Sequence, residues 1–122
     1  MVILEIFRRN KKLDFEMPSY RFDYGDKLAV KNLIIEWNSP AKTIGVVATT
    51  LVTKNPGNYG KHYQICSFVK PHNVFVTEVE FVNPTFYRVA GDEMQDAKIT
   101  IEPMFEKTIP EIKNAYIQLI VE

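Results

Sequence analysis

The residues best suited to metal binding or nucleophilic catalysis are few. The chain has one cysteine, Cys66, and two histidines, His62 and His72. His62 and Cys66 are four residues apart in a segment that reads as a strand, which places them on one face but about 13 Å apart. That separation is too long for shared zinc coordination or for a nucleophile–base pair. We therefore expect a packed or surface thiol, a solvated histidine and no bound metal.

Pairs of carboxylates are the second feature suited to catalysis. Asp23 lies close to Asp26, and Glu78 and Glu80 lie on the same face of a predicted strand, about 7 Å apart, a spacing that glycosidases use. Glycosidases draw these acids from a deep cleft, whereas Glu78 and Glu80 alternate with apolar residues as on a solvated face. The five glycines are scattered and form no phosphate-binding loop. We expect no enzymatic activity and no cofactor.

A basic stretch and an aromatic row raise two binding hypotheses. The basic side chains are Arg8, Arg9, Lys11 and Lys12, and the alternating aromatics are Tyr20, Phe22 and Tyr24. Cations beside aromatics suit single-stranded nucleic acid, and an exposed aromatic row also suits stacking on sugar rings. Aromatic alternation in a strand is more often core, so nucleic acid is the less favoured partner and a carbohydrate-binding or other ligand-binding β-sandwich remains an alternative.

The composition indicates one β-rich globular domain. The chain has 122 residues, 46% of them hydrophobic, and 15 basic residues balance 15 acidic ones. Val, Ile, Thr and the aromatic residues number 47, whereas Ala, Leu, Met and Gln number 19. Residues 1–61 carry a net charge of +4 and residues 62–122 a net charge of −4. A single domain over residues 1–122 is expected, with room for complementary charged surfaces.

Alternating apolar residues and β-branched runs, separated by Pro, Gly and Asn, predict extended segments throughout the chain. These segments are 2–7, 13–17, 20–24, 28–37, 44–53, 62–69, 74–82, 86–89, 98–102 and 115–122. A slip in the alternation near Asn32 predicts a β-bulge. Helix is expected at most as one turn near residues 110–114. The pattern predicts an all-β fold, an eight- to nine-stranded antiparallel sandwich of the single jelly-roll type.

The N-terminal residues, the apolar runs and the cysteine content indicate the compartment in which the protein is made. A single cysteine allows no internal disulfide, which favours synthesis in a reducing compartment. The opening residues 1–7 include Glu5 and lack a small-residue cleavage site, so no signal peptide is expected. No apolar run reaches the roughly 18–20 residues of a membrane span, and no membrane partner is expected.

Three segments carry a family resemblance. Residues 17–31 (MPSYRFDYGDKLAVK), the Trp37–Asn38 strand end and residues 117–121 (IQLIV) resemble the small single-jelly-roll minor capsid (penton-type) proteins of Polinton/Maverick and adintovirus-like elements. The likeness spans most of the chain and consists of strand order, size and lack of a catalytic set. It implies a structural protein of the virion capsid of a virus or endogenous viral element. Such a subunit forms a pentamer beside a major capsid protein, and a chain of this size has no room for an inserted domain.

A ring of identical subunits needs two different, matching surfaces on each chain. The expected charged contacts are Arg8, Arg9, Lys11 and Lys12 on one side and Asp92, Glu93 and Asp96 on the other. The expected aromatic anchors are Tyr59, Phe86, Tyr87 and Phe105.

Overall fold

A computed structural model of the protein describes residues 1–8, 14–16, 20–23, 25–51, 61–88, 98–105 and 108–122. The described strands are β1 (Val2–Arg8), β2 (Asp14–Glu16), β3 (Lys27–Trp37), β4 (Thr43–Leu51), β5 (Lys61–Lys70), β6 (Val76–Glu80), β7 (Tyr87–Arg88), β8 (Lys98–Pro103) and β9 (Ile112–Val121). The described residues contain no helix of the length and apolarity that crossing a bilayer requires. The expected all-β class is confirmed.

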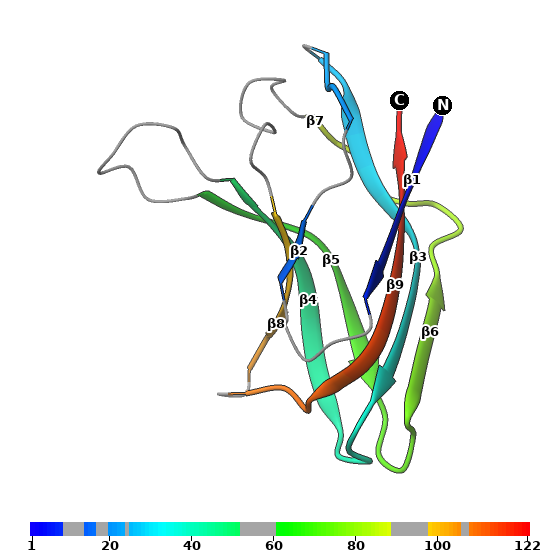
Figure 1. Ribbon diagram of the computed structural model, residues 1–122, viewed down its shortest axis with the longest axis vertical. Helices are drawn as coiled ribbons and strands as arrows, with labels where there is room; N and C mark the ends of the chain where they lie inside the picture. Colours follow the sequence, from blue (N-terminus) through cyan, green and yellow to red (C-terminus); the bar gives the residue numbers. More distant parts are fainter. Residues whose placement is uncertain (9–13, 17–19, 24, 52–60, 89–97, 106–107) are drawn as a thin grey trace.

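Two antiparallel sheets face each other as a β-sandwich (Figure 1). One sheet, called sheet A here, has the order β1-β9-β3-β6, with β7 also paired to β3. The other, sheet B, has the order β2-β8-β4-β5. Strands that are far apart in the sequence thus lie side by side, such as β1 with β9 near the two chain ends (Figure 1).

The strands form because their apolar residues alternate and point into one shared core. In β9, Ala115, Ile117, Leu119 and Val121 are all buried, as their period-two spacing predicts. Sheet B contributes buried residues such as Val47, Phe68 and Ile101 to the same cluster. β4 is buried on both faces over residues 45–48, as its nearly continuous β-branched sequence predicts.

The predicted bulge in β3 is confirmed. The register of β3 against β9 shifts between Val30 and Asn32. This extra residue returns Leu33, Ile35 and Trp37 to the core face, where each is almost fully buried.

Two sequence expectations need correction. The single helical turn near residues 110–114 is wrong, because β9 begins at Ile112, which pairs with Trp37. The segment 20–24 is not a strand over its described residues 20–23. Phe22 is instead buried in the core with Tyr20 packed edge-on against it, at 4.8 Å between ring centroids. Over its described residues this segment therefore offers no exposed aromatic row to a base or a sugar.

Candidate binding groove on the outer face of sheet A

The residues first considered for chemistry are not brought together. Cys66 is half-buried, and burial raises the pKa of its thiol to about 12, against a smaller lowering effect of a backbone hydrogen bond at Val47. Glu78 and Glu80 are exposed on β6. In the part of the chain that the structure describes, no three His, Cys, Asp or Glu residues gather where they would hold a metal ion. The side chain of His62 lies outside the described part.

The expected subunit contacts fall into two groups. Arg9, Lys11, Lys12, Tyr59, Asp92, Glu93 and Asp96 lie outside the described residues. Arg8 ends β1, with its backbone opposite Ala115 and its side chain outside the described part. Phe86 and Tyr87 are half-buried, and Tyr87 packs against the core. Phe105 is 79% exposed, so among the described aromatic anchors it alone is largely free to contact a partner.

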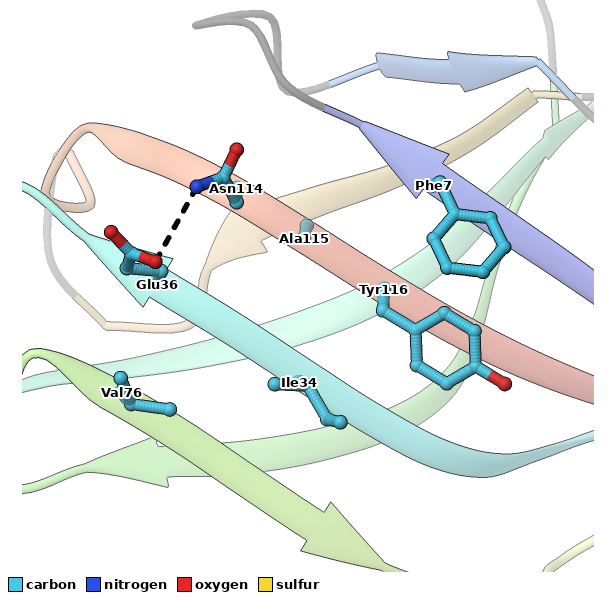
Figure 2. A pocket seen from close by; sticks show the side chains of 7 residues that line it. All are labelled: Phe7, Ile34, Glu36, Val76, Asn114, Ala115 and Tyr116. Atoms are coloured by element: carbon cyan, nitrogen blue, oxygen red, sulfur yellow. Dashed lines mark hydrogen bonds between the residues drawn. The ribbon is translucent and has the colours of Figure 1, made fainter.

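A groove lies on the outer face of sheet A (Figure 2). It is open, has a volume of about 560 Å³ and crosses β1, β9, β3 and β6. Its lining residues are Phe7, Ile34, Glu36, Val76, Asn114, Ala115 and Tyr116. Cross-strand register creates it, because Phe7 lies opposite Tyr116, which in turn lies opposite Ile34.

Two aromatic rings form one end of the groove. Phe7 and Tyr116 lie with ring centroids 4.8 Å apart and planes tilted by 42°. Figure 2 shows the two rings side by side, one from β1 and one from β9. Phe7 is 71% exposed although it is a large apolar residue. A flat ligand or an apolar side chain of a partner would find contact area here.

The Tyr116 hydroxyl is held in place from β1. It donates a 3.0 Å hydrogen bond to the carboxylate of Glu5. Desolvation and, after it, the negative charge and hydrogen bond of Glu5 raise the pKa of this phenol. At neutral pH Tyr116 is therefore a protonated donor, and Glu5 fixes the direction of its O–H.

The other end of the groove is polar. The Asn114 amide donates to Glu36 over 3.4 Å (Figure 2), and the Lys113 ammonium lies 3.2 Å from the same carboxylate. Hydrogen bonds from Lys113 and then Asn114 lower the pKa of Glu36, which stays ionised at neutral pH. The groove thus combines an aromatic end with a carboxylate–amide end.

Sequence reasoning did not single out Phe7 or Tyr116. Tyr116 follows from the alternation of β9, since Ala115 and Ile117 point inward and Tyr116 must point outward. The pairing that sets it beside Phe7 joins residues 109 positions apart and carries no local signal.

No family model, no curated protein and no solved structure matches this chain.

Proposed function

We propose that the sandwich is a single jelly roll. The support is a nested pairing pattern, in which β1 pairs with β9, β2 with β8, β3 with β6 and β4 with β5. A long antiparallel hairpin that rolls up on itself gives this order, with the first strand beside the last and the middle strands beside each other. β7 is then a two-residue addition on β3.

We further propose a self-assembling structural protein, a penton-type vertex subunit of the capsid of a virus or virus-derived element. The observation that carries this proposal is a set of exposed apolar side chains on sheet A and beside its edge strands. Val2, Ile3, Phe7 and Val76 belong to its strands, and Met1 and Phe75 flank β1 and β6. Large apolar side chains on an outer face and at an edge are typical of protein–protein contact surfaces.

These residues lie toward opposite sides of the sheet, as a ring requires. Ile3 and Phe7 belong to the β1 edge, whereas Phe75 and Val76 flank or begin the β6 edge. In a closed ring each subunit meets its neighbours through two unlike surfaces. The β1 side of one copy and the β6 side of the next would supply them, and the major capsid protein would surround the ring.

Solution mass tests this proposal, by light scattering after size exclusion over a range of concentrations. Assembly as a pentamer predicts a closed species near five times 14.1 kDa. Phe7→Ser should lower the assembled fraction about tenfold, since buried aromatic anchors carry much of the binding energy of an interface. Val82→Ser is the matched control, because Val82 is 77% exposed but lies outside sheet A. Equal effects of the two substitutions would contradict the proposed surface.

Carbohydrate binding is the second candidate function, and the groove favours it. An exposed ring next to an amide and a carboxylate is the combination that protein sites use to stack on a sugar face and bond its hydroxyls. A glycan screen tests it, followed by calorimetry on Asn114→Leu and Phe7→Ser. Binding by a monomer that both substitutions abolish would support this function and contradict the capsid proposal.

A further inference from the structure

Among the described residues β1 is an edge strand of sheet A, and the direction of each of its backbone N–H and C=O groups can be worked out residue by residue. Lys27 and Glu122 exchange both backbone hydrogen bonds, at 2.8 and 2.9 Å. In an antiparallel ladder such bonded pairs alternate, so even-numbered residues of β9 bond toward β3 and odd-numbered residues bond toward β1. The β1 partners of Leu119 and Ile117 are Leu4 and Ile6.

It follows that the N–H and C=O groups of the even-numbered residues of β1 hydrogen-bond to β9. The N–H and C=O groups of Ile3, Glu5 and Phe7 therefore point to the open side. Within the described residues, no backbone hydrogen bond reaches any of these six groups. Their side chains lie on the outer face of sheet A, and Ile3 is 51% exposed.

The other long edges of the sandwich carry features that oppose strand addition. β6 presents two exposed acids, Glu78 and Glu80, beside its free backbone groups. β5 is interrupted opposite Val47 and Ala48, where its register shifts. β1 pairs with β9 over seven consecutive residues with no register shift, and Glu5 is its one acid. β1 is thus the least protected of these edges.

We propose that β1 pairs with β1 of a second copy, as two antiparallel strands about a two-fold axis at Leu4. Ile3 then lies opposite the partner's Glu5, and Val2 lies opposite the partner's Ile6. Pairing centred on Glu5 would set two carboxylates directly opposite each other, which is unfavourable. Backbone pairing of β1 with β6, unlike the side-chain contact proposed for the ring, would add Glu78 and Glu80 to the contact.

This contact continues sheet A from one copy into the next and keeps both core faces on the same side. It differs from the proposed ring contact, because β1 pairs with itself and the ring joins unlike surfaces. Because the ring would also use the β1 side, a copy makes one contact or the other at that edge, and amide exchange at β1 compared with β6 distinguishes them.

Amide hydrogen exchange of the intact chain, followed by NMR at low and high protein concentration, measures whether single β1 amides become protected by this contact. The amides of Ile3 and Glu5 should become at least about tenfold more protected as concentration rises, because pairing with a second chain gives them hydrogen-bond acceptors. The amide of Glu78, which faces the open side of β6, should show no such rise. Equal exchange of the β1 amides at all concentrations would overturn the proposal, even where a ring forms.

A pair of proline variants tests the same contact by mutation. Glu5→Pro removes an N–H that makes no bond to β9, and edge strands accept proline at such positions. Glu78→Pro is the matched control, because the bonds from Phe81 to Lys31 and from Trp37 to Phe75 leave the Glu78 amide on the open side of β6. Glu5→Pro should abolish the concentration-dependent protection at Ile3, and Glu78→Pro should retain it. The opposite pattern, or equal loss in both variants, would overturn the β1 pairing.

Discussion

The indole nitrogen of Trp37 donates a 2.9 Å hydrogen bond to the hydroxyl of Thr77, with both residues buried. The bond joins β3 to β6 on the core side of sheet A. The Trp37 ring also lies 6.0 Å from the ring of Phe68 in sheet B. Trp37 thus links β3 to β6 through a hydrogen bond and contacts sheet B through its ring.

Removing either partner of this bond should destabilise the fold. Thr77→Val leaves a buried N–H without an acceptor, at a cost of about 1–3 kcal/mol, and Trp37→Phe leaves the hydroxyl without its donor. The double variant should lose less than the two single losses combined, because it leaves no unpaired partner. Urea unfolding of all four proteins measures the coupling. Strict additivity would mean that the hydrogen bond contributes nothing.

Gly45 should tolerate no side chain. A Cβ built on Gly45 would lie 2.5 Å from Cζ of Phe68, whose ring is packed in the core. Gly45→Ala is therefore expected to cost about 1–3 kcal/mol through overpacking. Phe68→Leu in the same protein should recover part of this loss by vacating the ring position. A neutral Gly45→Ala variant, measured by chemical unfolding, would contradict this packing.

The Cys66 thiol should be protected from alkylation until the chain unfolds. With a pKa of about 12 rather than 9.0, the thiolate fraction at pH 8 falls by on the order of a thousandfold. Native protein should react with iodoacetamide at a correspondingly lower rate than protein in denaturant. Fast labelling of the native state would contradict the burial of this side chain.

The Cys66 thiol also makes the free energy of unfolding fall at alkaline pH. Its pKa is raised in the folded state, so the folded protein holds the proton more tightly than the unfolded chain does. The contribution to stability is complete below about pH 9 and is lost as the pH rises from 9 toward 12. Cys66→Ala should show a smaller loss of stability over this interval. Identical alkaline unfolding curves for the two proteins would contradict the assignment.

Thr43 is an expected site of stabilisation. Its Oγ1 is buried and, within the described residues, has no hydrogen-bond partner. Thr43→Val replaces this hydroxyl by a methyl group of similar shape and should raise the free energy of unfolding by about 1 kcal/mol. Thermal unfolding measures the change. A destabilised variant would show that the hydroxyl is satisfied in solution.

The sequence predicts the elements of this fold better than their arrangement. Strict alternation identified the core face of β9, and the slip near Asn32 located the bulge in β3. Both are local patterns set by the two-residue period of a strand. The helical turn at 110–114 failed because pairing of Ile112 with Trp37 extends β9 toward the N-terminus, a long-range effect.

The groove was beyond sequence reasoning for a similar reason. The alternation of Tyr20 and Phe22 is a local pattern that favours a core position, and Phe22 is buried in the core. Phe7 and Tyr116 meet only through the pairing of the first strand with the last. Side-chain clusters on a sheet depend on such register, which period-two patterns do not encode.

Self-assembly of this chain can be measured as the light-scattering mass after size exclusion. The expected mass rises with concentration, to a closed species near five times 14.1 kDa for the ring or to two copies where β1 pairs with β1 instead. A mass of 14.1 kDa at every concentration would contradict it.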